Sequence, residues 1–175
     1  MAHPDDTVPG SGRHAAVAVV VDDASHVLLI RRADRAGDPW SGHIAFPGGG
    51  REEADADLLE TAIRETWEEV GLRLERATCV GRLGDVPTIR GLPDRVVRPF
   101  VFRVDAWPEP EPGPEVARCL RWPLPALASL EARTSFPYVW RGQPVTLPCI
   151  DREGERLWGM TLGMVDDLVA RLRSP

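Results

Sequence analysis

Three glutamates stand close together in the segment RETWEEVGL (residues 64–72), namely Glu65, Glu68 and Glu69. In a helix their i, i+3 and i+4 spacing places them on one face, where like charges repel one another. Because carboxylate oxygens are the ligands that hard divalent cations prefer, such a face could bind Mg²⁺ or Mn²⁺. The alternative is a solvated helix face that binds nothing, since acidic runs are common on protein surfaces.

A glycine-rich segment, FPGGG (residues 46–50), precedes these glutamates. Without side chains, its backbone can approach a metal ion or a phosphate closely. An acidic cation platform beside such a segment suits cleavage of a phosphoanhydride, because Mg²⁺ takes ligands from carboxylates and from substrate phosphates. The PGGG run itself is expected to break both helix and strand.

The hydrophobic pattern predicts strands and helices in mixed order. A helix is expected to begin at an N-cap of Asp55 or Asp57 and to end at Gly71. Its core face would carry Leu59, Ala62, Ile63, Thr66 and Val70. An amphipathic helix is expected at residues 160–173, and its apolar side would comprise Leu162, Val165, Leu168, Val169 and Leu172.

Strands are expected on both sides of the first helix, with turns between them. The expected strands and hairpins cover residues 14–22, 26–32, 77–84, 95–105, 116–122 and 138–150, the last as a hairpin around Arg141 and Gly142. A short helix is expected at residues 123–130, and the proline-rich loop at 107–115 cannot join a sheet interior. Since no regular βαβ rhythm appears, we expect an α+β type of α/β fold with a mixed β-sheet flanked by helices.

Composition limits the classes of function. The 175 residues suit a single domain at residues 14–173 after a loose tail at 1–13, and the formal net charge of −6 argues against binding a nucleic-acid polymer. Three cysteines, Cys79, Cys119 and Cys149, lie far apart without a CxxC pair, which indicates reduced thiols and a cytoplasmic protein. No apolar run approaches the ~18 residues of a membrane span.

The segment from Gly48 to Leu72 resembles the Nudix box. Its second half, REUXEEXGU with U an aliphatic residue, is matched by Arg64, Glu65, Glu68, Glu69, Gly71 and Leu72, while Thr66 takes the place of the first U. The resemblance implies a Nudix α/β/α sandwich with a mixed β-sheet. It also implies an Mg²⁺- or Mn²⁺-dependent hydrolase of small diphosphates linked to a further group, in a family whose members are often homodimers.

Roles follow from this resemblance position by position. Glu65, Glu68 and Glu69 would bind metal with the carbonyl of Gly48, and Arg64 would orient a glutamate. The general base would be one of these glutamates or Glu115 from a distant loop, unless Glu115 is an ordinary solvated acid. The box expects a glutamate where this chain has Ala56, which lies between Asp55 and Asp57.

A longer signature upstream resembles that of the coenzyme A-cleaving Nudix subgroup. It is matched by Leu28, Leu29, Arg32, Gly42 and the FPGG segment, and WGMT (residues 158–161) resembles a stretch near the C-terminus of the subgroup. The second arginine of the signature is displaced, with Arg35 as its nearest substitute. The residues expected to bind substrate are Arg32, Arg35, Phe46 and Gly49.

Three functions therefore stay open. The first is cleavage of coenzyme A or acyl-CoA to 3′,5′-ADP and (acyl-)4′-phosphopantetheine. The second keeps the chemistry and changes the substrate to ADP-ribose, NADH, a nucleotide sugar or a (d)NTP. The third is a catalytically silent domain that senses a ligand. Trp40 and Trp158 could stack on an adenine or simply pack, and His43 is expected to pack in its loop.

Overall fold

The computed structural model describes residues 14–87 and 96–173 of the chain, so the expected tail at residues 1–13 lies outside the described part. A mixed β-sheet is built around β1 (Ala15–Asp22). This strand pairs antiparallel with β2 (His26–Arg32) and parallel with β7 (Val96–Val104). The mixed sheet that the sequence predicts is therefore confirmed.

Five further strands complete the central sheet in the described residues. All of them pair antiparallel: β3 (Ile44–Ala45) and β8 (Val116–Pro123) with β2, β4 (Gly48–Gly50) with β1, and β5 (Cys79–Arg82) and β6 (Val86–Pro87) with β7. The resulting order along the main path is β3-β2-β1-β7-β5.

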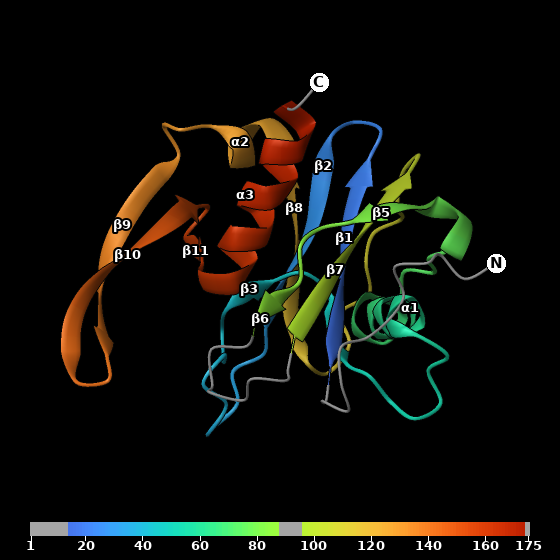
Figure 1. Ribbon diagram of the computed structural model, residues 1–175, viewed down its shortest axis with the longest axis horizontal. Coiled ribbons are helices and arrows are strands. Elements are labelled where there is room, and N and C mark those ends of the chain that lie inside the picture. Colours follow the sequence, from blue (N-terminus) through green and yellow to red (C-terminus); the bar gives the residue numbers. More distant parts are fainter. Residues whose placement is uncertain (1–13, 88–95, 174–175) are drawn as a thin grey trace.

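A separate antiparallel sheet lies beside the first, at the left of Figure 1. It has the order β11-β10-β9, with β9 (Arg133–Trp140), β10 (Gln143–Arg152) and β11 (Glu155–Trp158). The hairpin predicted around Arg141 and Gly142 is confirmed as the β9–β10 turn, while the third strand was not predicted.

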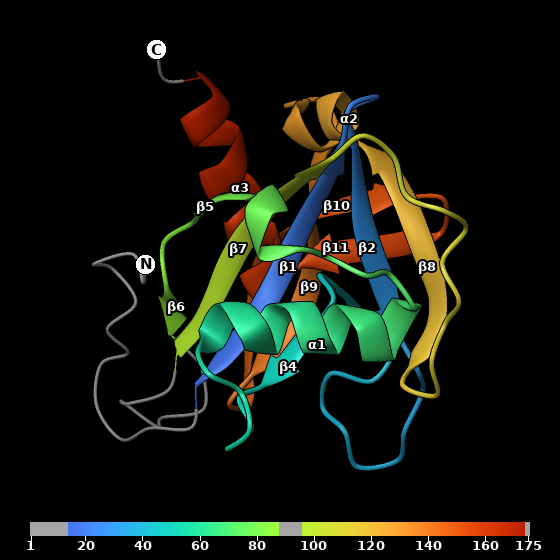
Figure 2. The same cartoon turned by 90° about the vertical axis from the view of Figure 1, so that its right-hand side faces the viewer.

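Helices cover the two faces of the central sheet. Figures 1 and 2 show α1 (Leu58–Val70) on one face and α3 (Gly159–Arg173) on the other, and the remaining helices are α2 (Leu124–Ala128) and a short 3-10 turn (Arg76–Thr78). In β1, Ala16 and Ala18 pack in the core cluster of α1, and Val19 packs in that of α3. This period-two alternation gives the sheet two cores and makes the fold an α/β/α sandwich. Among the described residues no helix is long and apolar enough to cross a membrane.

The first helix begins and ends as the sequence predicts. Asp57 is its N-cap, and the Asp57 carboxylate accepts a hydrogen bond of 2.8 Å from the backbone N–H of Glu60. Gly71 ends the helix in the left-handed conformation, with φ of 66°. The helix that carries the three glutamates is thus fixed at both ends by local sequence.

The expectation that PGGG would break regular structure is wrong. Gly48 to Gly50 pair with Val17 to Ala15 as strand β4. A Cβ atom on Gly48 would overlap the carbonyl oxygen of Ala16, so the two backbones approach more closely than any side chain at this position would permit. Glycine here makes a tight strand pairing feasible, although it lowers strand propensity elsewhere.

The apolar side expected for the last helix is correct except for Leu172. The side chains of Leu162, Val165, Leu168 and Val169 are buried, whereas Leu172 is 62% exposed in the last turn, beyond the sheet that the helix covers.

We expect Leu168→Ala to lower the free energy of unfolding by about 2–5 kcal/mol, because it opens a cavity in the core between α3 and the sheet. Leu172→Ala, on the same helix, should change it by less than about 0.5 kcal/mol. Urea denaturation followed by circular dichroism measures both values. Equal losses in the two variants would contradict the placement of α3.

Candidate active site

Backbone groups of β4 lie directly against the acidic face of α1. The N–H of Gly48 donates a hydrogen bond of 2.8 Å to Oε2 of Glu69. A Cβ atom on Gly49 would overlap the carboxylate of Glu65, so a side chain at this position would displace that carboxylate from its place beside β4. The glycine-rich segment and the glutamates of the helix, which the sequence analysis expected to act together, therefore lie side by side.

Two of the three glutamates are withdrawn from water. Glu69 is 5% exposed, and burial, reinforced by the charge of Glu65, raises the pKa of its carboxyl to about 7. Burial also raises the pKa of Glu65, against the opposing effect of Arg64. Glu68 is half-exposed. Glu65 and Glu69 therefore do not fit the alternative of a solvated helix face that binds nothing. Burying like charges costs free energy, and glutamates on an ordinary surface would stay exposed.

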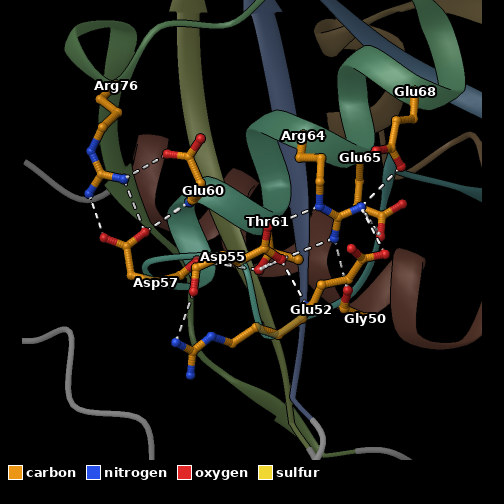
Figure 3. Close-up of polar contacts among 11 residues, drawn as sticks. Gly50, Glu52, Asp55, Asp57, Glu60, Thr61, Arg64, Glu65, Glu68 and Arg76 are labelled. Carbon is orange, nitrogen blue, oxygen red and sulfur yellow. Dashed lines mark hydrogen bonds and ion pairs between the residues drawn. The ribbon is translucent and has the colours of Figure 1, made fainter.

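The guanidinium of Arg64 binds the carboxylates around it, as Figure 3 shows. Its Nη1 atom lies 3.0 Å from Oε2 of Glu68 and 3.1 Å from Oε1 of Glu65. Its Nε and Nη2 atoms donate to the two oxygens of Asp55 at 2.9 and 3.0 Å, and Nη2 also donates to the carbonyl of Gly50. One cation thereby fixes side chains of α1 and the loop before it.

Asp55 lies directly before Ala56, where the box expects a glutamate, and it binds Arg64. The Asp55 side chain is buried and also accepts hydrogen bonds of 2.9 Å from the Thr61 hydroxyl and from the Glu52 backbone N–H. Its hydrogen bond with Arg64 is the largest cause that lowers the pKa of Asp55 to about 2. The acidic pair around Ala56 was the signal in the sequence, and the structure separates its members: Asp57 caps the helix and Asp55 binds Arg64.

The proline-rich loop at residues 107–115 closes the other end of α1. The N–H of Gly113 donates to the carbonyl of Glu69 at 2.8 Å, and that of Glu111 donates to the carbonyl of Val70 at 3.0 Å. These bonds satisfy carbonyl groups that a helix end leaves unpaired. Sequence reasoning missed this role of Gly113, since a contact between segments more than 40 residues apart leaves no local pattern.

Glu115 and the upstream arginines come to the same side of the molecule. Arg35 Nη1 lies 3.0 Å from Oε1 of Glu115, and the backbone N–H of Ala33 donates to the Glu115 carbonyl at 2.8 Å. Arg32 is bound by Asp38 at 2.9 Å. The charges of Arg32 and Glu115 both act on Glu69, whose pKa is set first by burial. These loops therefore border the acidic face.

Phe46 requires a correction. Its side chain is 2% exposed and packs in the core with Leu29 and Leu120, so it has no surface left for a substrate. It anchors the segment that leads into Gly48 and Gly49. An apolar residue before a functional loop can pack in the core or contact a ligand, and the sequence does not distinguish these two roles.

The donor set fits a hard divalent cation, since it consists of carboxylates and backbone oxygens. In the described residues, no group of three or more histidine, cysteine, aspartate or glutamate side chains is gathered closely enough to hold a metal ion. The reason lies in the contacts above: Arg64 engages Glu65 and Glu68, and Gly48 engages Glu69. Cation binding would require the first two carboxylates to turn from Arg64 toward the ion.

Comparisons with known proteins agree with this arrangement. The sequence model of the family described as NUDIX domain matches residues 12–139. A Nudix hydrolase named NudL from Photorhabdus laumondii is 26% identical over 172 residues, which are 97% of this chain and 90% of that protein. An uncharacterized protein of Schizosaccharomyces pombe is 48% identical over 69 residues, and this match spans 38% of the chain and only 21% of that protein.

The fold has counterparts among solved structures as well. The NUDIX domain of Shewanella oneidensis NrtR, solved as a complex with ADP ribose, superposes with a TM-score of 0.62 at 18% identity. The alignment covers 93% of this chain and 90% of that domain. At this identity the likeness establishes the fold alone.

We expect Asp55→Asn to lower the free energy of unfolding by about 2 kcal/mol near pH 7, since the lowered pKa of Asp55 stabilises the folded state. A carboxyl whose pKa is lower when folded stabilises at pH above its unfolded value of 3.8 and loses this contribution as the pH falls to about 2. The difference between wild type and variant should therefore shrink below pH ~4 in urea titrations. Glu53→Gln, an exposed position in the same loop, is the control. If the difference in the free energy of unfolding between wild type and Asp55→Asn stays constant down to pH ~2, the Arg64–Asp55 assignment is contradicted.

We expect Gly113→Ala to lower the free energy of unfolding by about 1–3 kcal/mol, because the new Cβ would lie 2.5 Å from the Glu68 carbonyl oxygen. Gly163→Ala, at a helical glycine with open space around it, should be neutral or stabilise by up to about 1 kcal/mol. Thermal or urea unfolding of both variants measures the contrast. Similar effects at the two glycines would show that the loop does not press on α1.

Proposed function

The chain belongs to the Nudix family, and we propose that it hydrolyses coenzyme A or acyl-CoA with Mg²⁺ or Mn²⁺ as the cofactor. The products would be 3′,5′-ADP and (acyl-)4′-phosphopantetheine. The observation that carries the hydrolase proposal is the buried acidic face of α1, with the backbone of Gly48 and Gly49 against it. Such a face concentrates negative charge where a diphosphate would also bring negative charge, so the site is suited to a substrate that arrives with cations.

Each residue of the site has a proposed part. Glu65, Glu68, Glu69 and the carbonyl of Gly48 would hold the metal. When bound, the cation makes a coordinated water easier to deprotonate and neutralises the leaving phosphate. Arg64 holds the free carboxylates in place, and the N–H of Gly48 orients Glu69. The base would be one of these glutamates or Glu115, which borders them.

The coenzyme A substrate is supported by the upstream signature and by the likeness to NudL proteins over nearly the whole chain. Arg32 and Arg35 border the acidic face and can bind phosphate oxygens in a bidentate manner. Arg35 is occupied by Glu115, so a phosphate must compete for it. ADP-ribose is the second candidate substrate, because the NrtR domain of the same fold was solved with ADP ribose.

A silent, ligand-sensing domain is the third reading. Intact Glu65, Glu68 and Glu69 count against it, since sensing a ligand does not require a buried acidic face. To separate the three, the purified protein is incubated with Mg²⁺ or Mn²⁺ and coenzyme A, acyl-CoA, ADP-ribose, NADH, nucleotide sugars or dNTPs. Products are then identified by mass. Turnover of ADP-ribose without coenzyme A would remove the leading substrate, and no turnover at all would favour the sensor.

We expect Glu68→Gln to lower kcat by about a hundredfold or more on whichever substrate the panel identifies, as when a catalytic electrostatic group is lost. The fold should persist, because Glu68 is half-exposed. Glu60→Gln changes a half-exposed glutamate on the first turn of the same helix and should leave kcat within about twofold. Full activity in Glu68→Gln would refute its assignment to the metal site.

A further inference from the structure

Aromatic side chains of the second sheet meet the segment that leads into the glycine strand. The ring of Trp158, at the end of β11, lies 5.3 Å from that of Phe136 and 5.2 Å from that of Tyr138, both on β9. The imidazole of His43 lies 4.8 Å from Trp158 in an edge-to-face arrangement. We call these four residues the aromatic cluster.

The aromatic cluster lies on the face of its sheet opposite to the one that packs in the core under α3. Strand pairing places Phe136 opposite Leu147 and Cys149 opposite Trp158, on one face of the pleat. Ile150 and its partner Leu157 are the next pair, on the opposite face, and are buried in the core under α3. All four members of the cluster are half-buried, so their rings keep part of their surface open to solvent.

Arg32 connects the aromatic cluster with the acidic face. The carbonyl of His43 accepts a hydrogen bond of 3.0 Å from the backbone N–H of Arg32. The charge of Arg32 acts both on His43 and on Glu69. Along the chain, His43 stands five residues before Gly48, at most ~17 Å if fully extended. A nucleoside diphosphate derivative can bridge that distance.

The chemistry of the aromatic cluster favours a flat, uncharged ligand group. Burial is the largest cause that lowers the pKa of His43, which favours the uncharged form of its ring. Arg156 stacks on Phe136 at 4.5 Å and covers part of that ring. Tyr138 and Trp158 are therefore the rings best placed to receive a ligand. Stacking of nucleic-acid bases on such rings tolerates any base, because every base has a π-face.

We propose that the aromatic cluster is the subsite for the planar base of the nucleotide, which stacks on Tyr138 and Trp158 while the diphosphate extends past Arg32 to the acidic face. This rests on the proposed function, since it takes a nucleoside diphosphate derivative as the substrate class. Adenine is the planar base in coenzyme A, ADP-ribose and NADH alike. The subsite thus does not depend on which of them is hydrolysed.

Tyr138→Ala tests the subsite in two independent measurements. We expect KM for the substrate that the panel identifies to rise about tenfold, with kcat within about twofold, and calorimetric affinity for AMP to fall to the same extent. Tyr138→Phe should behave as wild type because it keeps the ring. Val139→Ala, the neighbouring residue on the opposite face of β9 with a side chain 67% exposed, should change neither measurement. Tyr138→Leu removes the ring but keeps an apolar side chain of similar volume. It therefore distinguishes the loss of stacking from a loss of folding.

The outcomes separate the subsite from the proposed function. If wild type turns over no substrate, the hydrolase proposal fails, yet AMP binding that Tyr138→Ala abolishes still supports the base subsite. If Tyr138→Ala and Tyr138→Leu bind AMP like wild type, or if wild type does not bind AMP, the subsite is refuted. It is also refuted if the variants lose affinity for 4′-phosphopantetheine and keep that for AMP, since the cluster would then hold the other end of the substrate.

Discussion

The site depends on a single guanidinium placed among carboxylates. Arg64 binds Asp55 with two hydrogen bonds and reaches Glu65 and Glu68 with its remaining nitrogen. Without that charge, three acids of the helix and its leading loop would repel one another at a place where burial already disfavours ionisation. Asp55 is the partner that keeps Arg64 oriented, so a buried carboxylate outside the helix determines where the side chains of Glu65 and Glu68 lie. The one-residue shift from Ala56 to Asp55 is accommodated because the loop, not the helix, supplies this acid.

The second constraint is that backbone, and not side chains, surrounds Glu69. On one side the N–H of Gly48 holds its carboxylate, and on the other the N–H of Gly113 holds its carbonyl. Both glycines approach so closely that a Cβ would overlap neighbouring backbone. Glu69 is therefore fixed at both ends by groups that cannot titrate or change rotamer. This arrangement lets a buried carboxylate stay in one place although its pKa is raised to about 7.

Local sequence was sufficient for the elements and insufficient for their long-range contacts. The caps at Asp57 and Gly71, the strand at β1 and the hairpin of the second sheet follow from rules that act within a few residues, and the structure confirms them. The strand at Gly48–Gly50 was missed because propensity rules score side chains, whereas this pairing depends on their absence. Phe46 was assigned to substrate because apolar residues in loops serve core or ligand alike. The capping of α1 by Gly113 and the Arg35–Glu115 pair join segments far apart in the chain, where no periodicity exists.

In the proposed function, chemistry and selectivity are encoded in different parts of the chain. The acidic face of α1 and the glycine strand form one local unit, residues 48–71, whose pattern identifies the family from sequence alone. The groups that border this unit come from elsewhere. Arg32 ends β2, Arg35 lies in the loop after it, and Glu115 lies in the loop before β8. The aromatic cluster combines residues of β9 and β11 with His43, which precedes β3. Such loops and edge strands can vary without disturbing the two cores, since Ile150 and Leu157 anchor the second sheet from its other face. In the proposed function, the acidic face of α1 would hold the diphosphate, while the group attached to it would be selected by elements that lie outside the motif.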